Sequence, residues 1–486
     1  MNFPSRQQWK TALILFAAAF VLFLLYALPG LLDPELLMRI DSGTYLGPAR
    51  SLLQDFSYKS SPEAAGPTGL RVPLYPLYLA LGLLIGGNSL SVCVVMNCLI
   101  SALAIPLLYF AGLEFAKPDP DAEPKAVAAA LLLMLSPTEI AFAPMFLSEG
   151  MFVTGVVLEI LFTVRYVRRG GTGDLVLAAA SGGAAALIRP LNILWILPFV
   201  FVTFFAEGIT LRKKALHALL AVGIFALFVM PWILRNRSIG SGWRIDEVAA
   251  DSLRHNASVV ESRVHHLPAN FYREKYALHF EQQFRDRKRF PDRDARLSYE
   301  ERYLTGIIRN HMGVYFSLFF NPSKLVPDVP TFLENLRLTT GGKGTWDVIV
   351  KDGLWAGTRH YFEDKLYLPF LILPLMLVLL ATYVGAFAAL ICAVRKKQFR
   401  ILLLFCLFSF YYLMVVGPGG YPRFQLPALP FLCLLASRFT GLLERGGRPA
   451  HSQNETDTRP PGDDPSGETS ESPTSSKQSA TTGEIL

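Results

Sequence analysis

The sequence is poor in charge and in cysteine. Charged residues make up 17% of the 486 positions and hydrophobic residues 52%, a balance too apolar for a soluble enzyme and typical of a protein that crosses a membrane several times. The five cysteines all fall inside apolar segments and lack the spacing of metal ligands. The hydrophilic regions have no cysteine that could form a disulfide. We therefore expect the cysteines to be small core residues.

Motifs for nucleotide chemistry are also missing. There is no Gly-rich phosphate loop at a strand–helix turn, no HExxH motif and no serine nucleophile elbow, so no nucleotide cofactor is expected. The net charge of +7 could indicate a nucleic-acid partner. The basic residues, however, sit in short clusters beside apolar segments, as they do in membrane proteins. We therefore expect a lipid bilayer, and no nucleic acid, as the partner of this surface.

Apolar segments long enough to span a bilayer recur along the chain and predict an all-α polytopic membrane protein. The stretch 73–87 is apolar but short and contains Pro73 and Pro76, so it is either a weak span or a helix on the membrane surface. The expected spans lie near residues 11–28, 89–112, 126–143, 150–167, 173–188, 190–207, 215–234, 366–392, 401–416 and 424–440.

Basic clusters decide between the two interpretations of 73–87, because cytoplasmic loops are enriched in Lys and Arg. If this stretch is a surface helix, about ten helices span and every cluster faces the cytoplasm. If it spans, most clusters up to the Arg212-Lys213-Lys214 triplet flip to the outside. We therefore predict a multi-pass protein of an inner or plasma membrane, with surface helices in the first outer loop and both termini in the cytoplasm. The expected regions are a transmembrane module 1–234 with an outer loop 30–88, a mainly helical extracytoplasmic region 235–365, transmembrane helices 366–440 and a disordered cytoplasmic tail 441–486.

Carboxylates at the predicted outer boundary are the first candidates for chemistry. Asp41 either caps a surface helix, with Ser42 as the alternative cap, or acts as a catalyst in a groove open to lipid and water. Glu149 either complements a helix dipole, or meets Asp41 across the cavity, positions an acceptor or binds a divalent metal. Glu139 lies at similar depth, whereas Glu159 should lie near mid-membrane as a structural residue.

Arginines on the predicted outer face form the second set of candidates: Arg71, Arg189, Arg235, Arg237 and Arg423. The positive-inside rule disfavours arginine in short outer loops, so each of them needs a reason. One reason is phosphate, which a guanidinium binds through two hydrogen bonds, and the other is snorkelling to lipid headgroups. We expect a phosphate-binding role for Arg71 and Arg423, and snorkelling for Arg237.

Six short motifs follow one another along residues 10–440. They are Asp41-Ser42-Gly43-Thr44-Tyr45, Arg71-Val72-Pro73-Leu74-Tyr75-Pro76-Leu77, Ser136-Pro137 with Leu147-Ser148-Glu149, Leu187-Ile188-Arg189-Pro190, Pro231-Trp232-Ile233-Leu234-Arg235-Asn236 and Tyr421-Pro422-Arg423-Phe424-Gln425-Leu426-Pro427. In this order and with this topology, the chain resembles the C-type glycosyltransferase superfamily, especially its family-39-like and aminoarabinose-transferase-like bacterial members.

The resemblance implies a membrane hexosyl- or pentosyltransferase that works on the side away from the cytoplasm. The implied donor is a polyprenyl-phosphate sugar, and the acceptor is a glycan, lipid or protein of the cell envelope, as in polysaccharide or lipopolysaccharide biosynthesis. Two other functions remain open, namely a transporter or flippase of lipid-linked saccharide and a non-catalytic subunit of an envelope-polysaccharide assembly complex.

The resemblance also implies roles for individual residues. Asp41 is implied as the catalytic base and Glu149 as its partner acid, and the two are also the candidate ligands of a divalent metal ion. Many relatives carry two adjacent acids where this chain has Asp41-Ser42, which weakens the metal site. The residues expected to bind substrate or phosphate are Tyr45, Arg71, Arg189 and Arg423.

Overall fold

Long apolar helices dominate the computed structural model of the chain, which describes residues 4–117, 119–320, 325–339, 344–398, 407–414, 417 and 421–447. Within these residues there is no β-strand, apart from an isolated bridge between Lys59 and Pro67, so the expected all-α fold is confirmed. Residues up to Glu444 form one compact unit, and the description that follows concerns this unit.

Five helices of the described residues are long and apolar enough to cross a membrane. They are α1 (Arg6–Leu32), α4 (Leu90–Ala116), α7 (Glu149–Arg169), α10 (Leu211–Ser238) and α18 (Leu368–Arg395). A capping box starts α1, since Ser5 Oγ accepts a hydrogen bond from the Gln8 backbone N–H and the Gln8 side chain accepts one from the Ser5 N–H. The 27 residues of α1 extend about 40 Å, more than the roughly 30 Å of a hydrocarbon core.

The remaining expected spans are shorter or interrupted. The span expected over 126–143 is two helices, α5 (Ala122–Met134) and α6 (Pro137–Phe142), because Pro137 cannot continue the first helix and instead occupies the first turn of the second. The span expected over 173–188 is α8 (Thr172–Ile188). The span expected over 190–207 is formed by η2 (Pro190–Trp195) and α9 (Ile196–Thr203).

The C-terminal helices are only partly described. Of the span expected over 401–416, residues 407–414 are helical and the others lie outside the described residues. The last helices are η5 (Pro422–Ala428) and α20 (Leu429–Gly447), so the described helix continues past the boundary expected at residue 440. Residues 448–486, most of the expected tail, also lie outside the described part.

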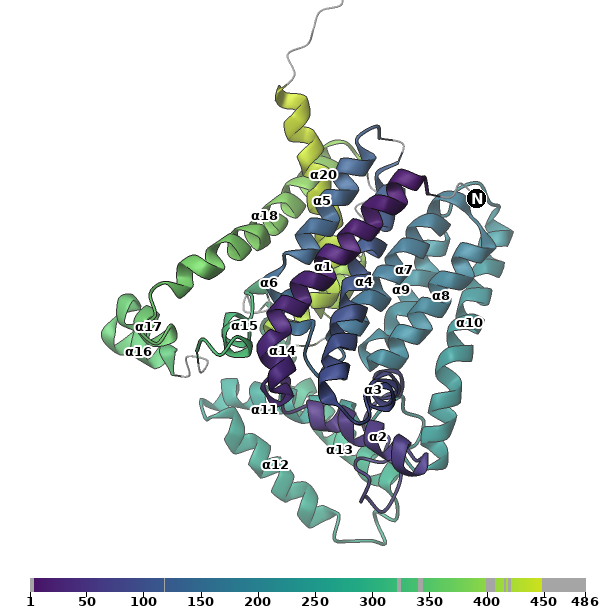
Figure 1. Cartoon of the computed structure of the whole chain (residues 1–486). Coiled ribbons are helices and arrows are strands. Elements are labelled where there is room, and N and C mark those ends of the chain that lie inside the picture. The colour runs from purple at the N-terminus through teal and green to yellow at the C-terminus, as the bar shows by residue number, and fades with distance from the viewer. Residues whose placement is uncertain are drawn as a thin grey trace, which may run out of the picture. The chain divides into compact units, whose positions relative to one another are not determined.

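Two helices of the loop that follows α1 run across the bundle rather than along it. After the short η1 (Pro34–Leu37), the chain forms α2 (Ser42–Asp55) and α3 (Leu74–Ile85). Figure 1 shows α3 along its own axis, while α1, α4, α7, α8 and α10 run lengthwise. The 12 residues of α3 extend about 18 Å, too short for a bilayer core. Its direction and length are those of a surface helix.

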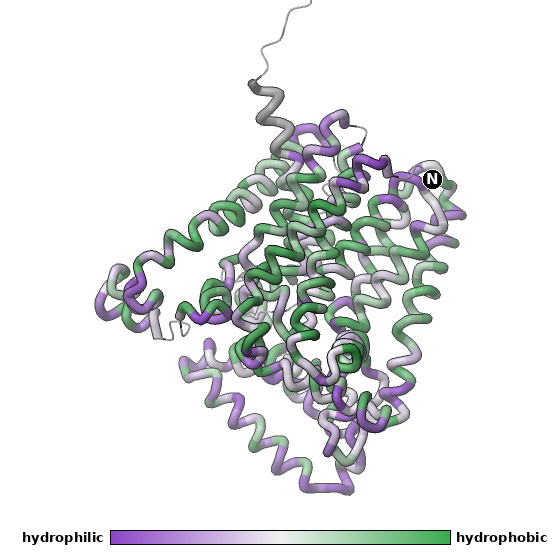
Figure 2. Tube along the Cα trace, in the orientation of Figure 1, coloured by the Kyte–Doolittle hydropathy of each residue, from purple (hydrophilic) through white to green (hydrophobic). Residues whose placement is uncertain are grey.

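Basic clusters gather at the end of the bundle opposite α2 and α3. There Arg169 at the end of α7 pairs with Glu114 at the end of α4, and Lys125 pairs with Asp119 in the α4–α5 connection. The end of α9 joins the same end, since Glu207 N–H donates to the Val167 carbonyl. Figure 2 shows polar residues at both ends and apolar residues between them. The chain therefore alternates between two distinct ends, as a multi-pass membrane protein does.

A helical region follows α10 at the α2–α3 end (Figure 1). Its helices α11 (Val248–His265), α12 (Ala269–Gln283) and α13 (Arg293–Asn310) share a small core that includes Tyr276, Phe280 and Leu304. Two short helices follow α13, namely α14 (Met312–Ser317) and η3 (Leu318–Phe320). Three further short helices precede α18, namely α15 (Val329–Asn335), α16 (Thr345–Asp352) and α17 (Leu354–Tyr361).

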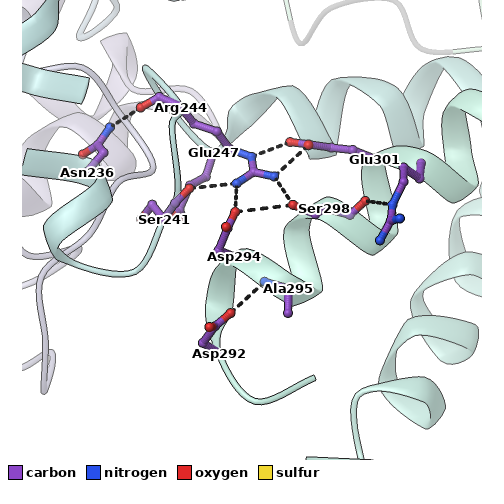
Figure 3. A network of polar contacts seen from close by, with 10 residues as sticks. Asn236, Ser241, Arg244, Glu247, Asp292, Asp294, Ala295, Ser298 and Glu301 are labelled. Atoms are coloured by element: carbon purple, nitrogen blue, oxygen red, sulfur yellow. Dashed lines mark hydrogen bonds and ion pairs between the residues drawn. The ribbon is translucent and has the colours of Figure 1, made fainter. Parts of the chain in front are cut away.

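One arginine fastens this helical region to the chain that leaves α10. Arg244 donates two parallel hydrogen bonds of 2.8 Å to Glu301 and a further bond of 2.8 Å to Ser298 Oγ, and it also pairs with Asp294 (Figure 3). All three partners lie on α13. Two acids, the Ser298 hydroxyl and the Ser241 carbonyl thus share the N–H donors of one guanidinium, which is the arrangement of a structural contact.

Candidate functional site

Asp41 stands at the start of α2, but its side chain does not cap the helix. The Ser42 hydroxyl instead accepts a hydrogen bond from the Arg39 backbone N–H at 2.9 Å. The Asp41 carbonyl accepts from the Thr44 hydroxyl at 2.6 Å, so backbone and neighbours satisfy the turn without the carboxylate. The carboxylate is free to face other parts of the chain.

Arg71 is the first partner of Asp41. Its Nη2 lies 2.9 Å from Asp41 Oδ1, and its Nε donates to Thr44 Oγ1 at 2.8 Å. The guanidinium also lies over the Tyr45 ring, 4.6 Å from its centre. The Tyr58 hydroxyl holds the backbone around Arg71 by donating toward the Arg71 and Val72 carbonyls at 3.0 and 3.1 Å. Asp41, Thr44 and Tyr45 of the first motif therefore orient the Arg71 guanidinium.

Arg423, from the beginning of η5, joins the two predicted acids. Its Nη2 lies 3.0 Å from Asp41 Oδ2 and its Nη1 lies 3.8 Å from Glu149 Oε1. Its Nε is buried and has no hydrogen-bond partner among the described residues. One N–H donor of this guanidinium is therefore left for a ligand.

Glu149 and Arg189 complete the cluster on its buried side. Glu149 begins α7, and its Oε1 lies 2.8 Å from Nη1 of Arg189, which directly follows α8. The Arg189 guanidinium lies 5.8 Å from the centre of the Phe152 ring. Glu149 is 3% exposed and the Asp41 side chain 34%, so only Asp41 is open to a substrate. Glu149 can act by holding Arg189 and Arg423 in place.

Tyr45 lies within the same cluster. Its hydroxyl is 3.3 Å from Ser148 Oγ, next to Glu149, and its ring packs edge-on against Tyr75 of α3. The six residues that the sequence singled out for catalysis and binding are thus brought together from the first loop, α7, the end of α8 and η5. Thr44, Ser148 and Phe152 also belong to the site. Thr44 lies inside the first quoted motif, and Ser148 lies beside Glu149 in the third. These positions are the sequence signals by which the two residues could have been found.

Positive charge exceeds negative charge in this cluster, because three guanidiniums surround two carboxylates. Burial alone raises the pKa of Asp41. Arg71, Arg423 and Arg189 together outweigh burial and hold the pKa of this carboxyl below its ordinary value. Asp41 is therefore ionised at neutral pH, and the cluster carries one net positive charge with which to attract an anion.

The donor set does not fit a divalent metal ion. Both Asp41 oxygens are held by guanidiniums, and Arg423 lies between the two carboxylates where a bridging cation would sit. The described residues contain no group of three or more His, Cys, Asp or Glu side chains arranged to hold a metal. A cation at Asp41 and Glu149 would have to displace at least one arginine and would add charge to a site that is already positive.

Sequence reasoning missed a buried acid beside the first loop. Asp246 is 6% exposed and precedes Glu247, whose N–H donates to the Gly69 carbonyl at 3.1 Å. Burial raises the pKa of Asp246 to about 7, and the nearby Arg71 opposes this rise. Asp246 lies in the region 235–365, where no quoted motif pointed to it.

The other two predicted acids lie outside the cluster. Glu159 closes a buried ring, in which Asn192 Nδ2 donates to its Oε1 at 2.6 Å and the Tyr412 hydroxyl lies 2.6 Å from its Oε2. Tyr412 is also 2.8 Å from Asn192 Oδ1, so the ring joins α7, η2 and the helical segment 407–414. Glu139 is buried in α6, and its Oε1 has no partner among the described residues. Glu159 has the contacts of the structural residue that we expected.

Helical spans, a first loop that lies across the bundle and a cluster of three arginines and two acids at one end are the features of a multi-pass membrane protein with a positively charged site. Residues 67–234, about a third of the chain, match the family described as dolichyl-phosphate-mannose-protein mannosyltransferase. No curated protein and no solved structure matches the chain significantly. This match supports a membrane protein of the C-type glycosyltransferase kind. The matched family indicates glycosyltransferase activity in general terms.

Proposed function

We propose that the protein transfers a sugar from a polyprenyl-phosphate donor to an acceptor hydroxyl, with Asp41 as the base. The observation that carries this proposal is the position of Arg423, which joins Asp41 to Glu149 and keeps one buried N–H donor unpaired. With Arg71 and Arg189 it offers a lipid phosphate a cluster of guanidiniums. A lipid-linked donor is already activated and needs no nucleotide pocket.

The transfer is a displacement at the anomeric carbon of the donor sugar. The acceptor oxygen forms a bond to this carbon, and the bond from the carbon to the phosphate oxygen breaks. The electron pair leaves with polyprenyl phosphate, where Arg71 and Arg423 offset the developing charge. The proton of the acceptor hydroxyl passes to Asp41.

Donor binding also solves a difficulty that the ion pairs create for Asp41. A carboxylate held by two guanidiniums is a weak base, because its pKa lies below the ordinary value. A phosphate that binds Arg71 and Arg423 competes for the same N–H donors and weakens their hold on Asp41. Its own negative charge raises the Asp41 pKa as well. The base therefore becomes stronger once the donor is in place. No step requires a metal ion.

The basic clusters give the orientation that we propose. Cytoplasmic loops carry an excess of Lys and Arg, and these clusters gather at the end opposite Asp41. The protein then lies in an inner or plasma membrane, with the site, the first loop and the region 235–365 outside the cytoplasm and both termini on the cytoplasmic side. The module 1–234 then supplies every site residue except Arg423, and 235–365 is the surface for an envelope acceptor.

A transporter or flippase of lipid-linked saccharide is less compatible with the cluster. Secondary transporters bind their substrate near the bilayer midplane, often at broken helices. Here Asp41 precedes α2 and Glu149 begins α7, at one end of the spans. A non-catalytic subunit would have no use for an accessible acid beside three arginines.

Lipid and glycan profiling of a deletion strain tests the proposed function. The strain should accumulate a polyprenyl-phosphate sugar and lose one envelope sugar, and the wild-type gene should restore both. Asp41→Asn should not restore them, whereas Asp55→Asn should. Asp55 is the matched control, because it lies at the other end of α2 and pairs only with Lys59 and Ser57 among the described residues. Restoration by Asp41→Asn would remove Asp41 from the mechanism.

A further inference from the structure

An apolar groove lies far from the candidate site, at the end of the bundle where the basic clusters gather. It has a volume of about 800 Å³, within the range of small-molecule sites. Its walls come from α1, α4 and α7, all of them candidate membrane spans. The side chains that line it include Trp9, Phe16, Leu107, Phe110 and Phe162. None of these residues has a part in the proposed reaction.

The walls of the groove carry aromatic side chains. Trp9 of α1 packs edge-on against Phe110 of α4, with 5.1 Å between the ring centres. Pro106, inside α4, also lines the groove.

Charged residues at one end of the groove have excess positive charge. Lys117 and Arg165 line it together with Glu114. The Glu114 carboxylate is shared between Lys117, at 3.1 Å, and Arg169. Arg165 pairs with Asp174 at 2.9 Å.

Arg168 adds to this charge, because it donates to the Glu114 and Lys117 carbonyls rather than to an acid. Four basic side chains thus meet two acids at this end. Lys117, with 45% of its side chain exposed, can turn toward a ligand.

A groove between spanning helices is filled by whatever the bilayer supplies, and apolar walls select an acyl chain. The basic end selects a headgroup with negative charge, because Lys and Arg side chains near the membrane surface attract anionic lipids. We propose that this groove binds one anionic phospholipid, with an acyl chain along Trp9 and Phe110 and its phosphate at Lys117 and Arg165. The bound lipid links α1 to α4 and α7 at the end away from the site. This proposal does not depend on the transferase activity.

Fluorescence quenching by brominated lipids tests the proposal on the full chain reconstituted in phosphatidylcholine vesicles. The vesicles contain a minor fraction of either dibromo-phosphatidylglycerol or dibromo-phosphatidylcholine. The difference in quenching between wild type and Trp9→Phe isolates Trp9 from the other tryptophans. We expect this difference to appear at lower mole fractions of dibromo-phosphatidylglycerol than of dibromo-phosphatidylcholine. Equal quenching by the two analogues would overturn the assignment of an anionic headgroup. Equal quenching of wild type and Trp9→Phe by both analogues would overturn the lipid site at Trp9.

Charge variants locate the headgroup. Lys117→Gln should weaken the preference for dibromo-phosphatidylglycerol about fivefold, the factor that corresponds to about 1 kcal/mol. Arg212→Gln is the matched control, because Arg212 is exposed at the same end of the bundle but does not line the groove. An unchanged unfolding temperature without added anionic lipid shows that each variant is folded. Equal loss of preference in both variants would mean that the surface, and not the groove, attracts the lipid.

Discussion

The acids at the end of the bundle and the acid in its middle have opposite kinds of partner. Asp41 and Glu149 are held by Arg71, Arg189 and Arg423, whereas Glu159 is held by the neutral side chains of Asn192 and Tyr412. Glu159 lies ten residues beyond Glu149 on α7, about 15 Å deeper along the helix. The same helix therefore carries one acid in each environment.

The difference separates a reactive site from a structural one. Guanidiniums keep a carboxylate ionised and near water, where it can exchange one anion for another. A closed ring of neutral hydrogen bonds uses both oxygens of Glu159 and leaves no donor for a ligand. Changes at the first site should thus affect activity with little effect on stability, and changes at the second should do the reverse.

The largest expected effect follows from Asp41→Asn. Loss of a general base lowers a rate by about 10²–10⁴-fold, and the amide keeps the shape of the side chain. Sugar transfer by the purified variant should fall by this factor, while its unfolding temperature in detergent stays close to that of wild type. Asp55→Asn serves as the control and should transfer sugar normally. Near-normal transfer by Asp41→Asn would assign the base elsewhere.

Arg423→Gln is the next strongest perturbation. It removes the guanidinium that lies between the two acids, and loss of one donor to a developing anion typically costs about 10²–10³-fold in rate. Steady-state kinetics should show a lower kcat together with weaker binding of polyprenyl phosphate. Arg237→Gln changes an exposed arginine that lies over Trp243 and should have no such effect. Equal behaviour of the two variants would deny Arg423 a special role.

Glu159→Ala should reverse this pattern. It leaves Asn192 and Tyr412 buried without their partner, at a cost of about 1–3 kcal/mol for an unsatisfied group. The unfolding temperature should fall by several degrees, while transfer measured well below that temperature stays within about threefold of wild type. Glu159→Gln keeps hydrogen-bonding capacity, so its unfolding temperature should lie between those of Glu159→Ala and wild type. Lost transfer at unchanged stability would move Glu159 into the chemistry.

Asp246 offers the smallest and most specific test, because it is a buried acid near Arg71 without an ion pair among the described residues. Its pKa is about 7 in the folded chain, against about 3.9 for an unfolded chain. Between these values the folded chain holds a proton that the unfolded chain has lost, so stability falls as the pH rises toward 7. Asp246→Asn should flatten this part of the plot of unfolding temperature against pH. The same slope of unfolding temperature against pH in Asp246→Asn and wild type would contradict a raised pKa of Asp246.

Much of the site could be predicted from the sequence, because membrane proteins restrict where charges occur. An Asp, a Glu and several Arg at the outer boundary of apolar segments need a reason to be there, and this rule found Asp41, Glu149, Arg71 and Arg423. The basic clusters also separated the surface helix 73–87 from the spans. Both inferences depend on the cost of charge in lipid, which is large enough to read from composition.

Other features depend on contacts between distant segments. The pairing of Arg423 with Asp41 joins residues 382 positions apart, and no local pattern records it. Asp246 is buried in a segment that the Glu247 backbone N–H joins to the Gly69 carbonyl of the first loop. The break at Ser136-Pro137 was visible as a proline, but prolines kink some spans and end others, and packing decides between the two outcomes. Tertiary contacts therefore supply what sequence patterns omit.

The central claim is that a polyprenyl-phosphate sugar reacts at the Asp41 cluster. Release of polyprenyl phosphate from a panel of radiolabelled polyprenyl-phosphate sugars, mixed with envelope extract as acceptor, tests it most directly. Wild-type protein should release the lipid phosphate and move the label to the acceptor fraction for one member of the panel. Asp41→Asn should bind the same donor and release almost none. Equal release by both proteins, or passage of the labelled lipid across vesicles without a covalent product, would contradict the account.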